Sequence, residues 1–186
     1  MNDNVFMAGY GGQGILLIGN LLACAAILEN KNATYFPAYG PEKRGGAASC
    51  TVIVSGVEIG SPVMGRPDSM LLFNQLAMDK YFERIASGGL CIYNSCLIED
   101  VPQLRTDIRK IAIPANALAV ELGNARLVNM VMLGAYATQT GIVAMDTLKA
   151  GLDAILPERN KGFIPGNIMA LDCGAEYVRK AGVIKD

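Results

Sequence analysis

The chain has 186 residues, a net charge of −1, and 52% hydrophobic against 18% charged residues. The near balance of 16 basic and 17 acidic residues argues against a protein that binds nucleic acid or a membrane surface. The sequence contains no histidine, which excludes Ser-His and Cys-His nucleophiles and every His-ligated metal site.

The length is that of one domain, so residues 1–186 are predicted to form a single unit. The longest apolar stretch, residues 15–28, is interrupted by Gly19 and Asn20 and falls short of the roughly 20 residues that a membrane span needs. The start of the chain lacks the basic residues of a signal peptide. We therefore expect a cytoplasmic protein.

The five cysteines show no Cys-x-x-Cys spacing, which argues against an iron–sulfur cluster or a zinc site in this chain. We expect them, including the neighbouring Cys91 and Cys96, to be small buried residues in a reducing compartment.

In chain order, an apolar run predicts a first strand at residues 5–9, followed by a helix from Gly12 to about Glu29. Further strands are predicted at residues 33–36, 47–55, 57–59, 69–73, 90–93 and 108–113, with 57–59 as the hairpin partner of 47–55. Further helices are predicted at residues 76–86, 115–122, 127–140, 145–156 and, after a charged connection, 166–181 behind Pro165.

This order predicts an α/β fold with three layers, α/β/α, around a Rossmann-like, mostly parallel sheet with an antiparallel edge hairpin. Two explanations of the high apolar content remain open. A parallel sheet is buried on both faces, and another protein chain can cover apolar surface. We expect both, and we expect the isolated chain to form a homodimer. The small face of Gly19, Ala23 and Ala26 is one candidate contact, provided that it does not face the sheet.

The segment from Gly9 to Gly14 matches the pattern G-x-G-x-x-G between a strand and a helix, where backbone N–H groups can cradle a phosphate. Dinucleotide binding normally requires an acidic residue at the end of the second strand, and residues 33–37 contain none. A tight turn for strand–helix packing, a site for another phosphate and a contact with a partner's backbone therefore stay open.

A second loop of unusual composition spans residues 37–46. Gly40 and Pro41 force a turn, Lys43 and Arg44 supply two cations, and Gly45 and Gly46 permit close approach of the backbone. The two loops should lie side by side at the ends of the first strands. The second loop is then either a functional surface or a solvated turn. Residues 129–135, by contrast, are interpreted as a core helix.

Gly11-Gly12-Gln13-Gly14, followed by Tyr39-Gly40-Pro41-Glu42-x-Arg44-Gly45-Gly46, resembles the gamma subunit of 2-oxoacid:ferredoxin oxidoreductases. The similarity extends through 59–62, 79–81, 129–135 and 167–174 and is nearest to the short 2-oxoglutarate-type subunits. An indolepyruvate-type subunit and a stand-alone NAD(P)-binding enzyme are the alternatives.

The resemblance implies a subunit with no catalytic residue of its own. The complex oxidatively decarboxylates 2-oxoglutarate or pyruvate with thiamine diphosphate, transfers the acyl group to coenzyme A and passes electrons through iron–sulfur clusters to ferredoxin. The implied partners are alpha and beta subunits and, as a further candidate, a ferredoxin-like delta subunit. The chain itself carries no cofactor. We expect its paired loops to border the active site or the coenzyme A region: Gly11, Gly12, Gln13, Gly14, Tyr39, Gly40, Pro41, Glu42, Arg44, Gly45 and Gly46.

Overall fold

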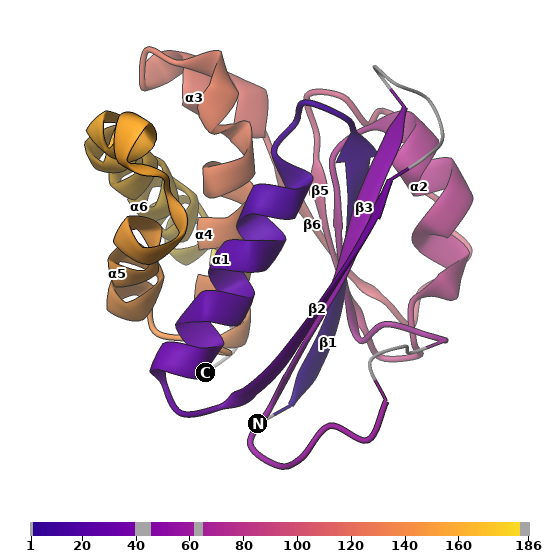
Figure 1. The fold of residues 1–186 in the computed structure, drawn as a ribbon. Helices are drawn as coiled ribbons and strands as arrows, with labels where there is room; N and C mark the ends of the chain where they lie inside the picture. Colours follow the sequence, from indigo (N-terminus) through magenta and orange to yellow (C-terminus); the bar gives the residue numbers. More distant parts are fainter. Residues whose placement is uncertain (1, 40–45, 62–64, 183–186) are drawn as a thin grey trace.

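One six-stranded sheet organises the chain, in a computed structural model that describes residues 2–39, 46–61 and 65–182 (Figure 1). Its strand order is β2-β3-β1-β4-β5-β6. The strands are β1 (Asp3–Tyr10), β2 (Asn32–Tyr39), β3 (Ala47–Ser55), β4 (Ser69–Leu72), β5 (Leu90–Asn94) and β6 (Arg109–Ile113). Strand β3 runs antiparallel to both β1 and β2, and the pairs β1–β4, β4–β5 and β5–β6 are parallel, so the predicted α/β fold with a mostly parallel sheet is confirmed.

Helices dominate the last third of the chain, as the sequence predicts. The α-helices are α1 (Ile15–Leu28), α2 (Gln75–Tyr81), α3 (Ala115–Glu121), α4 (Val128–Thr140), α5 (Met145–Ile155) and α6 (Ile164–Lys180). Short 3-10 helices occur at Phe82–Arg84, Ala125–Leu127 and Glu158–Phe163.

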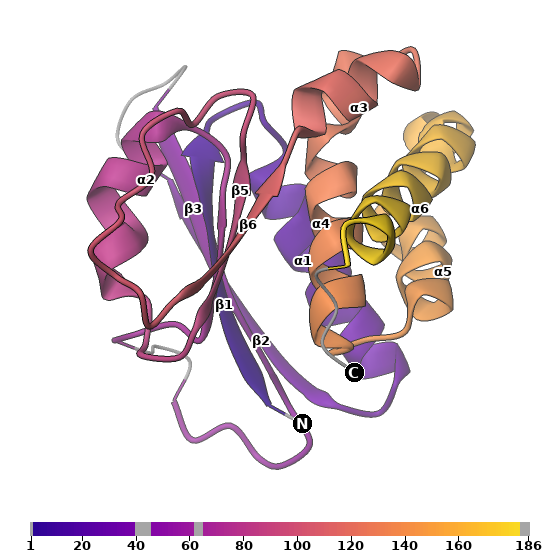
Figure 2. The same cartoon turned by 180° about the vertical axis from the view of Figure 1, so that it is seen from behind.

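The helices lie on the two faces of the sheet in unequal numbers. Figures 1 and 2 show α2 alone on one face, with α1 and α4 on the other and α5 and α6 outside them. Alternate side chains of β1 point to opposite faces of the sheet. Val5 and Met7 belong to the core beneath α1 and α4, and Phe6 and Ala8 belong to the core beneath α2. The three-layer prediction holds, with a double helical layer on one side.

Helix α4 explains much of the apolar composition. Eleven of its 13 residues are buried, because the sheet side, α1 and α6 enclose it. A helix that is apolar on every side is typical of such a central position. Some large apolar side chains remain exposed, including Ile27 and Leu28 at the end of α1, so part of the surface is still open to a partner.

The predicted strand at residues 57–59 is wrong. Strand β3 already pairs with β1 on one side and with β2 on the other, so it offers no free edge to a further strand. The edge hairpin exists in another form, as β2 and β3. Strand β2 includes Pro37, which an edge strand tolerates because one side of its backbone is unpaired.

Three helix boundaries also differ from the prediction. The first helix begins at Ile15, and the segment predicted as one helix, residues 76–86, divides into α2 and a 3-10 turn. The connection at 157–162 is largely a 3-10 helix, after which α6 begins at Ile164, directly before Pro165.

The small face of α1 is not a partner surface. A Cβ added to Gly19 would lie 2.5 Å from Cys50 Sγ and 2.9 Å from the Tyr35 ring. Ala23 and Ala26 are buried with it. The condition for self-association through this face is therefore not met, because the face packs against β2 and β3 at Gly19.

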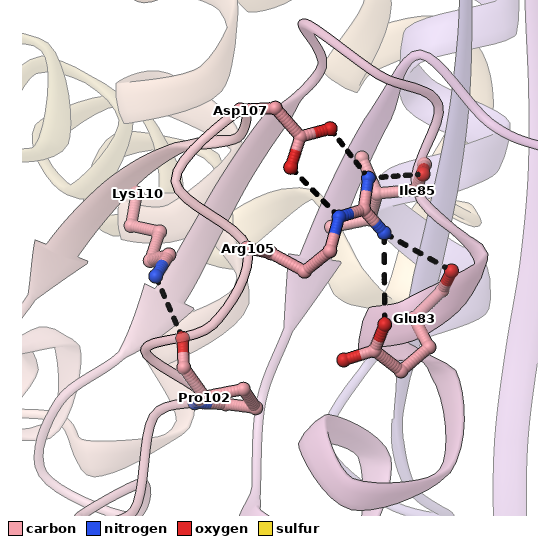
Figure 3. Close-up of polar contacts among 6 residues, drawn as sticks. All are labelled: Glu83, Ile85, Pro102, Arg105, Asp107 and Lys110. Atoms are coloured by element: carbon pink, nitrogen blue, oxygen red, sulfur yellow. Dashed lines mark hydrogen bonds and ion pairs between the residues drawn. The ribbon is translucent and has the colours of Figure 1, made fainter.

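A long connection from β5 to β6 is held against the α2 side by one arginine. Arg105 makes two parallel hydrogen bonds of 2.8 Å to Asp107 and donates to the carbonyl oxygens of Glu83 and Ile85 (Figure 3). Lys110 donates to the Pro102 carbonyl at 2.6 Å. The Arg105 guanidinium holds the pKa of Asp107 well below its usual range.

A half-buried carboxyl group joins the start of β1 to α4. Asp3 accepts hydrogen bonds from Ser69 of β4 and from the fully buried Tyr136 of α4. Burial raises the pKa of Asp3, and the two hydroxyl donors oppose that shift because they stabilise the carboxylate.

We expect Tyr136→Phe to lower the free energy of unfolding by about 1.5–3 kcal/mol at neutral pH, the usual loss when a hydrogen bond to a charged group is removed. Because the pKa of Asp3 is higher in the folded than in the unfolded state, the free energy of unfolding falls as pH rises above the unfolded pKa of 3.8. Losing the tyrosine donor raises the Asp3 pKa further, so the deficit of the variant should grow from pH 4.5 to pH 7.5. Urea unfolding at both pH values tests this, with Tyr177→Phe on α6 as the control. An equal deficit at both pH values would contradict the assignment.

Candidate functional site at the carboxyl ends of the strands

The connections that follow β1 and β4 diverge to opposite faces of the sheet. Helix α1 follows β1 onto one face, and α2 follows β4 onto the other (Figure 1). Adjacent parallel strands with diverging connections leave a crevice at their carboxyl ends, which is the usual ligand position in open α/β sheets. The predicted glycine loop, Gly11 to Gly14, connects β1 to α1 at this edge of the sheet.

Positive backbone angles define the glycine loop. Gly12 has φ 98° and Gly14 has φ 74°, so the helix begins only at Ile15. No side chain in the described part of the chain caps α1. Its first N–H groups and its positive dipole end therefore lie at the carboxyl edge of the sheet, an arrangement that favours an anion. A Cβ on Gly12 would meet no atom within 4 Å, so the requirement for glycine there is conformational.

Gln13 fixes the loop to the neighbouring strand end. Its side-chain oxygen accepts a 2.6 Å hydrogen bond from the Tyr10 N–H and a 3.2 Å bond from the Asn74 amide. Asn74 lies between β4 and α2, and its own oxygen caps α2 by accepting from the Ala77 N–H at 2.9 Å. The Gln13 side chain thus positions the loop.

Asn129 supports the loop from beneath. This residue of α4 is 5% exposed and donates from its side chain to the Gly14 carbonyl at 3.3 Å. A Cβ on Gly14 would collide with the same amide group. The prediction that residues 129–135 form a core helix is correct, but it missed this polar contact.

The ends of the two predicted loops meet. The Gly11 N–H donates to the Gly46 carbonyl at 2.8 Å, and Tyr10 pairs with Ala47 across the strands. Tyr39 closes β2, opposite Ala48. Gly40, Pro41, Glu42, Arg44 and Gly45 lie outside the described residues, as does Lys43. Their assignment to the site stays a prediction.

Neutral amide groups continue the same edge of the sheet beyond Asn74. Asn94, fully buried at the end of β5, donates to the Asn116 side chain at 2.7 Å and accepts from the Cys96 N–H. Gln75 accepts from the N–H groups of Glu99 and Asp100. Sequence reasoning missed these residues; their signal is an asparagine at or just after the end of two apolar strands, Asn74 after β4 and Asn94 in β5.

The sheet order argues against a dinucleotide site. In the classic dinucleotide fold the strand after the first helix lies beside the first strand. Here β3 lies between β1 and β2, which places the end of β2 roughly 9–10 Å from β1. The G-x-G-x-x-G pattern of this chain therefore lies in a sheet whose strand order differs from that of the classic dinucleotide fold.

Two cysteines are the buried residues that the sequence predicts, and burial raises the pKa values of Cys50 and Cys91 to about 12. Cys96 is exposed, so the expectation of burial is wrong there, because it lies in the turn after β5. Among the described residues, no three His, Cys, Asp or Glu side chains gather into a metal-binding group. None of the helices in that part of the chain has the length and apolarity that a membrane crossing demands.

Comparison with known proteins gives a family match over nearly the whole chain. Residues 4–177 match the model of pyruvate ferredoxin/flavodoxin oxidoreductase. A 2-oxoglutarate synthase subunit KorC from Methanocaldococcus jannaschii is 34% identical over 182 residues, which cover 97% of this chain and 96% of the relative. The chain spans only 36% of the length of the ketoisovalerate oxidoreductase subunits VorA that it matches at 35% identity.

Two solved structures share the fold. A keto/oxoacid ferredoxin oxidoreductase gamma subunit from Geobacter sulfurreducens is 30% identical, with a TM-score of 0.81 and coverage of 96% of this chain and 99% of that one. A 2-oxoglutarate:ferredoxin oxidoreductase from Magnetococcus marinus, solved with 2-oxoglutarate, coenzyme A and succinyl-CoA bound, is 25% identical with a TM-score of 0.88. The match covers all of this chain and 32% of that one. Because the family model and a near-full-length relative agree, the chain belongs to the pyruvate ferredoxin/flavodoxin oxidoreductase family, whose members among its relatives include gamma subunits.

Proposed function

We propose that this chain is the gamma-type subunit of a 2-oxoacid:ferredoxin oxidoreductase. The observation that carries the proposal is the reciprocal match with KorC, in which each sequence is covered almost completely. On this proposal the complex converts a 2-oxoacid and coenzyme A to an acyl-CoA and CO₂, and ferredoxin takes the electrons. We favour 2-oxoglutarate as substrate because the near-full-length relatives are named for it.

The proposed partners are alpha and beta subunits, with a ferredoxin-like delta subunit as a further candidate, in the cytoplasm. Thiamine diphosphate and the iron–sulfur clusters belong to those subunits. Exposed Ile27, Leu28 and Phe36 support a chain that is covered in its complex. For the same reason we infer that the isolated chain self-associates, which light scattering would detect.

The role proposed for this chain is to border the coenzyme A region with its carboxyl edge. The uncapped start of α1 and the exposed Gly12 support an approach by phosphate. The amide side chains that hold this edge together, Gln13, Asn74 and Asn94, carry no charge, so the sequence-predicted cations Arg44 and Lys43 are the complement that a phosphate requires.

Reconstitution tests the proposal directly. The alpha and beta subunits of the same organism are purified with and without this chain, and ferredoxin reduction is measured with 2-oxoglutarate, pyruvate or ketoisovalerate plus coenzyme A. We expect coenzyme A-dependent activity only with this chain present, and 2-oxoglutarate as the best substrate. Full activity without the chain would refute the role; preference for another 2-oxoacid would change only the substrate.

We expect the isolated chain to bind neither NAD nor NADP tightly. Residues 33–37 of β2 supply no acidic group for a ribose, and β3 separates β2 from β1 and the glycine loop. Isothermal titration calorimetry of the isolated chain with each nucleotide measures this. A dissociation constant in the micromolar range would restore the alternative of a stand-alone dehydrogenase.

A further inference from the structure

Two cations beside α2 lie over aromatic rings. The guanidinium carbon of Arg84, in the 3-10 turn after α2, is 5.3 Å from the centroid of the Phe6 ring and 5.6 Å from that of the Tyr81 ring. The two rings meet edge to face, with their centroids 4.8 Å apart. Lys80 Nζ lies 5.2 Å from the Tyr81 centroid. The aromatic pair therefore holds both cations beside β1, the strand to which Phe6 belongs.

Neither cation has an acidic partner among the described residues. Lys80 and Arg84 are exposed, and none of the ion pairs in that part of the chain includes their side chains. The adjacent Glu83 is paired, since it lies 3.7 Å from Arg105 of the β5–β6 connection (Figure 3). A cation–π contact leaves most of the five N–H donors of a guanidinium available, so Arg84 can donate a forked pair of hydrogen bonds to a carboxylate from outside.

An exposed aromatic side chain continues this surface across the sheet. Phe6 of β1 and Phe36 of β2 are both paired with Thr51 of β3, which lies between them. Residues directly opposite one another project to the same face of a sheet, so Phe36 lies on the α2 face, about 9–10 Å from Phe6 across two strand spacings. Helix α2 packs against β1 and β4 and does not extend over β2 (Figure 1). The Phe36 side chain is therefore 52% exposed.

We propose that Arg84, Lys80 and Phe36 form a docking surface for an acidic segment of another subunit, an inference that rests on the proposed function above. A carboxylate of that subunit accepts the forked bond from Arg84, and Lys80 adds a second positive charge beside it. An apolar side chain next to the carboxylate covers the Phe36 ring. Charge complementarity selects an acidic partner, because an apolar or basic surface would bury the two cations without a counterion.

The test is the affinity of the full chain for the purified alpha and beta subunits, measured by biolayer interferometry at low and at high salt. Arg84→Met keeps an apolar stem over the rings and removes the charge. We expect it to weaken binding about tenfold at low salt, and by less at high salt because salt screens the wild-type contact. Phe36→Thr, which keeps a strand-forming residue, should weaken binding about threefold. Arg126→Met, at an exposed arginine before α4 on the other face of the sheet, is the matched control and should bind as the wild type does.

Equal affinities for Arg84→Met and Arg126→Met, with the wild type binding tightly, would overturn the docking surface alone. Failure of the wild-type chain to bind these subunits at all would overturn the proposed function as well. Lys80→Gln, which leaves the contacts of Arg84 with the rings intact, should weaken binding two- to threefold by about the same salt-dependent mechanism. Thermal melting of each variant checks that it is folded. Loss of self-association in Arg84→Met, measured by light scattering, with unchanged subunit binding would assign the surface to a second copy of the chain and overturn the proposal.

Discussion

Gly174→Ala is expected to lower the free energy of unfolding by about 3 kcal/mol or more. An added Cβ at this residue of α6 would collide with the Val131 carbonyl oxygen and lie 2.8 Å from the carbonyl carbon and 3.0 Å from the Ala135 nitrogen. These are backbone atoms of α4, which cannot rotate away as a flexible side chain would. The two helices must therefore separate, and α4 is the most enclosed helix of the core.

Gly134 of α4 lies equally close to the backbone of α6, because a Cβ added to it would collide with the backbone of Leu171. The matched control is Gly166→Ala in the first turn of α6, where the Cβ would meet only Leu127 Cδ1 at 4.0 Å. Since alanine favours the helix over glycine, this control should be neutral or stabilising by up to about 1 kcal/mol. Urea unfolding of the wild type, Gly174→Ala and Gly166→Ala measures the three free energies of unfolding. Equal values for the two variants would show that the backbones of α4 and α6 are not in contact at Gly174.

The sheet was predictable wherever the local pattern of residues agrees with the tertiary structure. The alternation of small and β-branched residues predicts β3 with its correct bounds, Ala47–Ser55. The same kind of pattern fails at 57–59, because a strand also needs a free edge to pair with, and β3 has both edges occupied. No local sequence pattern indicates whether the edges of a strand are already paired with other strands.

The position of the glycine loop between β1 and α1 was predictable from the sequence, but the contacts that support it were not. The two glycine-containing loops were expected to meet, and the Gly11–Gly46 hydrogen bond joins their ends. Asn74 and Asn129 were missed because they reach the loop from far along the sequence. Asn129 carried a readable signal, since an amide within an apolar helix must find a buried partner.

Replacing Arg44 with alanine is expected to impair the assembled enzyme while leaving this subunit folded. A guanidinium flanked by glycines can make a forked bond to a phosphate or carboxylate, which lysine cannot reproduce. Gly46, two residues later, is hydrogen-bonded to the glycine loop, so the segment ends beside the positive end of α1. Loss of a charge pair whose partner stays buried costs about 2–5 kcal/mol, or roughly 30-fold to more than 1,000-fold in binding.

Gly12→Val tests the same edge of the sheet through the backbone conformation, where Arg44→Ala tests it through a charge. A β-branched residue at φ 98° is strained, so the turn and the first N–H groups of α1 should shift, although no atom blocks the new side chain. We expect a higher Michaelis constant for coenzyme A with a small loss of subunit stability. An unchanged Michaelis constant for coenzyme A would contradict this expectation, and thermal melting of the isolated chain checks that it remains folded.

The most direct test of the account is the Michaelis constant for coenzyme A in ferredoxin-linked oxidation of the 2-oxoacid by the reconstituted complex. Three forms of this chain are compared: wild type, Arg44→Ala and Arg179→Ala, the last of which removes the same charge from the last turn of α6. The account predicts that only Arg44→Ala raises this constant or prevents assembly, with the melting temperature of the subunit unchanged. If Arg44→Ala leaves assembly and the Michaelis constants for coenzyme A and the 2-oxoacid as in the wild type, the loop is a solvated turn and the carboxyl edge is not the site.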